Sequence, residues 1–274
     1  MIDFHTHILP NQVDNIIQSF GNDEVFKEMF DNNKETSDYS KLLANMYKHS
    51  ISKSVILGYG WTNFEVLKMS NSYNLDCAIN NKELIPFCSV NPHFGKKSND
   101  ELERCISLGA KGIGEIHPTV QNLEMTNLEI WKDTMQLALS ADLPISIHCS
   151  EPVGHIYPGK GNTELNKVYE FIKLFPKNKI VLSHWGGGLF FYELMKEVKE
   201  FSQNVYYDTA ATSYLYYKDI FEISLKIIGP EKILFGSDFP ILNPSRVLGE
   251  MKNISISDIE KLTTLNAKFL LGLN

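Results

Sequence analysis

Two histidines on one face of a predicted strand are the first residues of the sequence that could do chemistry. His5 and His7 follow a short apolar stretch and are separated by one threonine. Because side chains alternate across a β-strand, the two imidazoles point to the same side and together can bind one cation. Such a pair is weak support by itself, since polar residues also end strands by chance.

Three more polar residues, far apart in the sequence, stand in the same kind of position. His148, His184 and Asp238 each end or follow a short apolar run. Several imidazoles with a carboxylate form a donor set that suits a borderline-soft divalent cation such as zinc. The joint pattern therefore indicates a metal site far more strongly than any one of these residues.

The elements that must position these residues are short apolar runs spread along the whole sequence. Most runs are nearly continuous in apolar residues, which is typical of strands buried on both faces in parallel sheets. The predicted strands are residues 1–5, 53–57, 84–90, 111–116, 144–148, 179–183, 204–208 and 232–235.

Longer amphipathic stretches alternate with these runs, and residues 21–37 are predicted as a loop or short helix over one end. Eight strand–helix repeats within 274 residues predict an α/β fold, a single (β/α)8 TIM barrel of parallel strands forming one domain over residues 1–274. Barrel enzymes bind substrate where the strands end, so the polar residues should meet there. The predicted helices are residues 39–49, 63–80, 100–108, 127–141, 163–174, 189–201, 214–228 and 257–271.

Composition narrows the partners of the protein. The formal net charge of −7 argues against nucleic acid or an anionic membrane, because both favour a basic surface. The four cysteines show no CxxC spacing, which fits a reducing compartment. No apolar run approaches the roughly 20 residues of a membrane-spanning helix. We therefore predict a cytoplasmic protein that acts on a small-molecule substrate, with no nucleic-acid or membrane partner.

The motifs at the strand ends resemble those of a known family over the whole chain. They are Ile2–His7, Gly112–Pro118, His148, Ser183–Gly187 and Phe235–Pro240. In these motifs the sequence resembles the amidohydrolase superfamily, nearest its amidohydrolase-2 branch of small barrel hydrolases and decarboxylases. Because dimers are common in this family, the resemblance implies a homodimer. It also implies a bound divalent metal, for which zinc is the first candidate and manganese the second. The implied metal ligands are His5, His7, His148 and Asp238.

The fourth strand departs from the pattern of many relatives. They carry a lysine near its end, where this sequence has Glu115, while Lys111 lies too early on the strand. A glutamate there resembles the TatD-like deoxyribonucleases, in which it bridges two metals. Glu115 and His117 occupy the same alternate positions of the strand as Lys111 and Ile113, so we expect Glu115 and His117 to face inward. Glu115 is therefore a candidate metal ligand, and its alternative roles are a general acid or a salt-bridge partner of a substrate group. The number of bound metal ions, one or two, stays open at the level of the sequence.

The predicted reaction is hydrolysis of a small ester, lactone or amide. A bound cation lowers the pKa of its water to about 7 and polarises a carbonyl oxygen. Asp238 could take the proton from this water and pass it to the leaving group, while His184 could orient the water, stabilise the oxyanion or bind a second metal. Aromatic and polar residues after other strand ends are candidates for the substrate pocket. These are Trp61, His93, His117, Trp185 and Tyr207, with Tyr59, His155, Tyr157 and Phe239 as further candidates.

Three other functions remain open at the level of the sequence. The same metal site could serve a non-oxidative decarboxylase of an aromatic or unsaturated acid, as in related amidohydrolase-2 proteins. Glu115 suggests a TatD-like phosphoesterase, against which the acidic net charge argues. A barrel that binds metal without catalysis is the last alternative, disfavoured by the complete ligand set.

The metal content of protein purified without chelator or added metal is the first test. Plasma mass spectrometry should find near-stoichiometric zinc or manganese, and His148→Ala should lose it because one ligand is gone. One ion per chain would favour His184 as acid or base, and two would make Glu115 and His184 ligands. If no metal binds even after reconstitution, the proposed chemistry is wrong and only the barrel remains.

Overall fold

The computed structural model describes residues 1–11, 15–30 and 36–273, and its centre is a ring of eight parallel strands. Neighbouring strands pair in chain order from β1 to β8. The ring closes where Phe4 N–H donates to the Phe235 carbonyl at 2.7 Å and His7 N–H donates to that of Phe239 at 2.8 Å. The predicted (β/α)8 barrel is confirmed. Its strands are β1 (Ile2–His7), β2 (Lys53–Leu57), β3 (Leu84–Cys88), β4 (Gly112–Ile116), β5 (Ile145–Ile147), β6 (Ile180–Leu182), β7 (Val205–Asp208) and β8 (Ile233–Leu234).

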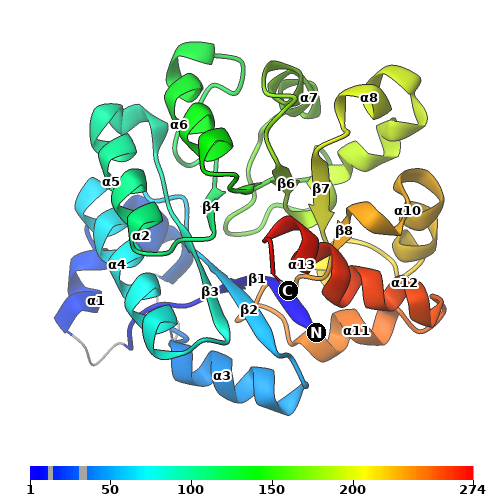
Figure 1. The fold of residues 1–274 in the computed structure, drawn as a ribbon, viewed down its shortest axis with the longest axis horizontal. Coiled ribbons are helices and arrows are strands. Elements are labelled where there is room, and N and C mark those ends of the chain that lie inside the picture. The colour runs from blue at the N-terminus through cyan, green and yellow to red at the C-terminus, as the bar shows by residue number, and fades with distance from the viewer. Residues whose placement is uncertain (12–14, 31–35, 274) are drawn as a thin grey trace.

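Helices surround this ring (Figure 1). The α-helices are α1 (Asn15–Phe20), α2 (Glu24–Phe30), α3 (Tyr39–Lys48), α4 (Phe64–Asn80), α5 (Lys96–Ser107), α6 (Leu128–Ser140), α7 (Leu165–Leu174), α8 (Lys196–Phe201), α9 (Thr212–Leu215), α10 (Ile220–Ile228), α11 (Pro244–Glu250), α12 (Ile256–Glu260) and α13 (Asn266–Leu270). Shorter helical segments are η1 (Pro92–Phe94), η2 (His184–Leu194), η3 (Pro230–Lys232) and the π-helical η4 (Lys261–Leu265).

Three predicted helices are divided in the structure. The segment 189–201 is interrupted where Met195 is extended, between η2 and α8. Tyr216 is extended between α9 and α10, and η4 separates α12 from α13. The apolar pattern predicted one helix in each case because periodicity registers neither a short break, such as residues 216–219, nor a change to π-helical geometry within a helix. The predicted short helix within 21–37 is present as α2, and residues 31–35 lie outside the described residues.

The barrel interior is filled by a compact apolar cluster. The ring of Phe4 meets that of Phe87 edge to face, with centroids 5.7 Å apart. Ala267 and Leu270 of α13 belong to the same cluster and cover one end of it. The other strand side chains form a larger cluster with the surrounding helices. The remaining strand members of the interior cluster are Ile2, Val55, Leu57, Ile85, Val181 and Leu234.

Strand β4 does not alternate regularly. Its pairing with β5 shifts register between Ile113 and Ile116, and both isoleucines pack in the outer cluster. The alternation that relates Glu115 to Lys111 and Ile113 therefore does not hold along β4: Lys111 is exposed, and Ile113 packs outside the barrel interior. An irregular register resets which face each side chain occupies. Glu115 nevertheless reaches the centre of the barrel.

No helix in the described part of the chain is long and apolar enough to cross a membrane.

Gly112 is a position where the barrel interior has no room for a side chain. A Cβ there would lie 2.2–2.5 Å from ring atoms of Phe87. We expect Gly112→Ala to lower the free energy of unfolding by about 1–3 kcal/mol, as overpacked cores do. The matched control is Gly249→Ala in α11, where a Cβ meets nothing within 4 Å. Its stability should be unchanged or higher by up to about 1 kcal/mol. Urea unfolding measures both, and equal stabilities would contradict the packing argument.

Candidate metal centre

Four side chains from the first, fourth and last strand ends converge inside the barrel mouth. The Nε2 atoms of His5 and His7 lie 3.0 Å apart. Asp238 Oδ1 lies 3.6 Å from His5 Nε2 and 3.8 Å from His7 Nε2. Glu115 Oε2 lies 3.8 Å from each of the two histidines. All four residues are buried, so their donor atoms face one another and not solvent.

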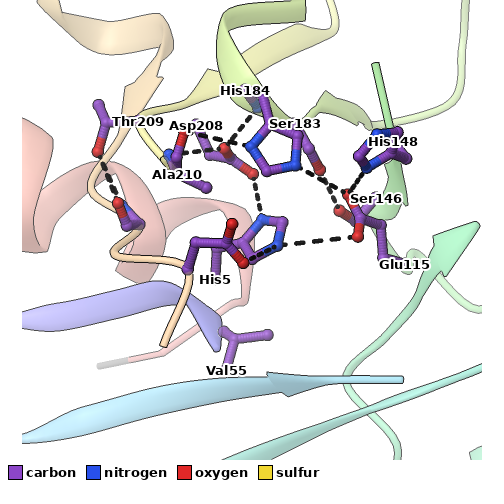
Figure 2. Close-up of polar contacts among 12 residues, drawn as sticks. His5, Val55, Glu115, Ser146, His148, Ser183, His184, Asp208, Thr209 and Ala210 are labelled. Atoms are coloured by element: carbon purple, nitrogen blue, oxygen red, sulfur yellow. Dashed lines mark hydrogen bonds and ion pairs between the residues drawn. The ribbon is translucent and has the colours of Figure 1, made fainter. Parts of the chain in front are cut away.

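The second oxygen of Glu115 faces two further histidines. Oε1 lies 3.2 Å from His148 Nδ1 and 3.6 Å from His184 Nε2. Figure 2 shows the carboxylate between His148 and His184 on one side and His5 on the other. Two groups can each surround one cation, His5–His7–Asp238 and His5–Glu115–His184. The structure thus brings together the predicted metal and catalytic residues, with His5 common to both groups and Glu115 in the second.

Hydrogen bonds on the far side of two rings fix which nitrogen faces the centre. His5 Nδ1 lies 2.8 Å from Asp208 Oδ2, and His184 Nδ1 lies 3.2 Å from the Ala210 carbonyl. Both contacts are made when Nδ1 carries the proton, which leaves the Nε2 lone pair directed at the cluster. This is the usual arrangement of histidines that bind metals.

Asp208 is a site residue that the sequence reasoning missed. Its Oδ1 accepts the backbone N–H groups of His184 and Ala210 at 2.9 and 3.0 Å, so the carboxylate is held rigidly. It ends the apolar run of β7 just as Asp238 follows that of β8. The signal that could have identified Asp208 was therefore present in the sequence.

Left-handed backbone turns place two of the ligands. His184 and Trp185 have φ values of 54° and 59°, and three glycines with positive φ follow them. A Cβ on Gly187 would lie 2.4 Å from the Ser150 carbonyl, so only glycine lets this turn approach the β5 strand end. Asp238 has a φ of 68°, and its N–H donates to the His5 carbonyl at 2.9 Å. The turn after β6 and the turn after β8 are thereby fixed against their neighbours.

Burial and the crowded carboxylates shape the charges of the site. Burial alone would lower the pKa of His5, but Asp208, Glu115 and Asp238 raise it to about 10. Burial and the neighbouring charge of His5 lower the pKa of His7 to about 4. Burial disfavours the charge of Glu115, yet His148 and His5 hold its pKa well below the usual value. The centre therefore keeps Glu115 ionised and attracts positive charge, which a divalent cation can supply.

His148 is held on three sides. Besides Glu115 at Nδ1, its Nε2 lies 3.0 Å from Ser150 Oγ. The ring of His117 stacks on it at a centroid distance of 4.0 Å. His117 Nε2 donates to the Gly159 carbonyl at 3.0 Å, so this predicted pocket residue lies beside the centre and supports a ligand.

Four of the other predicted pocket residues, Trp61, His93, Trp185 and Tyr207, make their contacts away from the histidine cluster. Tyr207 donates to Glu193 and Trp185 donates to Thr212, and both pack in the outer cluster. Exposed His93 bonds to the Asn122 carbonyl. Trp61 is buried behind Tyr59, and it is Tyr59 that stacks on His7 at 4.5 Å.

Comparison with known proteins places the chain in a family. The sequence matches the family model described as amidohydrolase over residues 2–273. The chain therefore belongs to the amidohydrolase family. Membership of this family and the donor groups found in the structure both support a divalent metal. None of the curated proteins matches the sequence significantly.

Solved structures share the fold at low sequence identity. A 5-carboxyvanillate decarboxylase from Sphingomonas paucimobilis is 15% identical with a TM-score of 0.79, covering 100% of this chain and 99% of its own. A dihydroxybenzoic acid decarboxylase from Polaromonas sp. JS666, with bound manganese, is 17% identical with a TM-score of 0.74, covering 99% and 96%. A 4-oxalomesaconate hydratase from Rhodopseudomonas palustris is 16% identical with a TM-score of 0.68, covering 99% and 95%.

Removing the charge of Asp208 tests how the centre is oriented. We expect Asp208→Asn to weaken zinc binding by about 10- to 100-fold, because His5 loses the partner that fixes its tautomer. Competition with a fluorescent zinc chelator measures the affinity, with Asp133→Asn on the exposed face of α6 as the control. Unchanged affinity in Asp208→Asn would contradict the orienting role.

The raised pKa of His5 also fixes the sign of the pH dependence. Below about pH 10 the metal-free ring of His5 is positively charged, so both of its nitrogens carry a proton. A cation that binds Nε2 must displace the proton there. The same competition assay should therefore show zinc affinity rising with pH, by up to about tenfold per unit. Affinity independent of pH between 6 and 9 would contradict this electrostatic account.

Proposed function

We propose that the protein is a metal-dependent hydrolase of a small ester, lactone or amide. The observation that carries the proposal is the buried carboxylate of Glu115, which faces His5 and His7 with one oxygen and His148 and His184 with the other. Asp238 completes the donor group of His5 and His7. A divalent cation bound there lowers the pKa of a water molecule and polarises a carbonyl oxygen. The residues around it then have separate tasks.

Asp238 is the proposed acid and base. Its Oδ1 faces both His5 and His7 within 3.8 Å, and its backbone is fixed by the bond to the His5 carbonyl. A carboxylate in this position can take the proton of the attacking water and return it to the leaving oxygen or nitrogen. Burial of the whole cluster excludes bulk water and strengthens these interactions.

His184 is better suited to bind metal than to donate a proton. Its Nδ1 lies 3.2 Å from the Ala210 carbonyl, so in the neutral ring the lone pair of Nε2 is directed toward Glu115. We therefore propose that two cations could be held here. His5, His7 and Asp238 would hold one, and Glu115 and His184, with His148 beside them, would hold the other. The donor set suits zinc first and manganese second, and the metal count distinguishes one ion from two.

The placement of the arginines supports a substrate without a carboxylate. The sequence has only two arginines; Arg104 pairs with Glu101 at 2.7 Å on α5, and Arg246 lies over the ring of Tyr214. Neither provides the guanidinium fork that commonly holds a carboxylate in a binding site. A neutral ester, lactone or amide needs no such group.

Decarboxylation of a small aromatic acid is the second candidate. It is favoured by the structural neighbours, several of which are decarboxylases. The same metal centre would then hold the substrate carboxylate directly, without help from an arginine.

An assay panel on the zinc- or manganese-loaded protein separates the candidates. We expect turnover of p-nitrophenyl acetate or a lactone, no carbon dioxide from 2,6-dihydroxybenzoate and no turnover of bis-p-nitrophenyl phosphate. Asp238→Asn should lower kcat by about 100-fold or more, since one acid–base group contributes about 10²–10⁴. The exposed Asp133→Asn is again the control. Release of carbon dioxide would favour the decarboxylase, and turnover of the phosphate ester would favour the phosphoesterase. Unchanged turnover in Asp238→Asn would exclude Asp238 as the acid and base.

A further inference from the structure

The loop between β5 and α7 lines a cavity that is open to solvent and that the catalytic scheme does not use. Its volume is about 470 Å³, within the range of small-molecule sites. Most of its lining surface is apolar and comes in part from Pro152, Val153 and Ile156, while Glu151, Lys160 and Glu164 also line it. The cavity therefore has the size and the apolar surface to accept a hydrocarbon group, with charged side chains around it.

Ser150 joins this cavity to the metal centre. Its Oγ lines the cavity and lies 3.0 Å from His148 Nε2. The His148 side chain is 11% exposed, more than the others of the cluster, such as Glu115 at 9% and His5 at 0%. A molecule in the cavity is thus next to the most accessible edge of the centre.

The loop is tied to the same ligand at two points. Gly161 N–H donates to Ser150 Oγ at 2.9 Å, and the Gly159 carbonyl accepts from His117, which stacks on His148. The base of the cavity therefore has a fixed position relative to the donor atoms. A substrate group seated there would place its attached carbonyl at a reproducible distance from the cluster.

Two apolar side chains on the loop face water. Val153 is 74% exposed and Ile156 is 96% exposed. Single exposed apolar residues are common, but these two also line a cavity beside buried catalytic groups. An apolar group bound between them would remove both from water, which is favourable.

We propose that this cavity is the subsite for an apolar group of the substrate, such as the alkyl chain of an acyl ester. The proposal rests on the hydrolase function and adds the substrate class to it. The loop 150–164 would then determine which substrates bind, while the residues of the metal centre would carry out the reaction. Ser150 marks the boundary between the two.

A series of p-nitrophenyl acetate, butyrate and hexanoate tests the subsite in the metal-loaded protein. Each methylene buried in the cavity should raise kcat/KM by about fourfold. The double variant Val153→Asp/Ile156→Asp should lose this gradient, measured as the ratio of its own hexanoate and acetate rates, because charged walls do not favour hydrocarbon. The control Ile256→Asp replaces an isoleucine that is 87% exposed on α12 and should keep the gradient. A wild-type rate independent of chain length, or a gradient that survives in the double variant, would overturn the subsite.

A binding experiment separates failure of the subsite from failure of the hydrolase function. Hexanamide titrated into the zinc-loaded protein should shift the amide resonances of Gly154 and Gly161, and not in the double variant. These shifts without turnover of any ester would leave the subsite standing and exclude the hydrolase. Ester turnover with shifts confined to other segments would exclude the subsite and leave the hydrolase standing.

Discussion

The buried carboxylate of Glu115, shared among four histidines, is the constraint on which the rest of the site depends. A carboxylate that is 9% exposed costs several kcal/mol in desolvation unless charge and hydrogen bonds compensate it. His5 and His7 face one oxygen, and His148 and His184 face the other. These contacts require the ends of β1, β4, β5 and β6 to meet within a few ångströms, which a closed barrel provides. The register shift in β4 completes the arrangement by turning Glu115 inward.

A second layer of contacts converts this cluster into an oriented donor set. Asp208 and the Ala210 carbonyl engage the outer nitrogens of His5 and His184, and Ser150 engages that of His148. Each bond directs the remaining ring nitrogen to the centre, so little reorganisation is needed when a cation binds. Because Ser150 also lines the cavity of the β5–α7 loop, the same layer that orients the ligands connects them with the surface that would recognise a substrate.

The structural relatives illustrate how far the fold constrains the reaction. A decarboxylase and a hydratase share this barrel at TM-scores of 0.79 and 0.68 but only 15% and 16% identity. Similar barrels host different chemistry because the strands form the scaffold and the loops after them form the site. For this chain, the features that favour hydrolysis are local. They are the shared carboxylate of Glu115, the position of Asp238 and two arginines engaged elsewhere.

The sequence by itself determined the strands and most of the helices, because buried parallel strands are continuous apolar runs and their spacing is regular. It also identified His5, His7, His148, His184 and Asp238, since each follows such a run. Only the tertiary structure decided which neighbours face the centre. Tyr207 and Trp185 pack away from the centre, and Asp208 contacts the outer nitrogen of His5. The regular alternation of side chains along β4 ends at a register shift after Ile113. Those outcomes depend on pairing between strands distant in the chain, and local periodicity carries no information about that pairing.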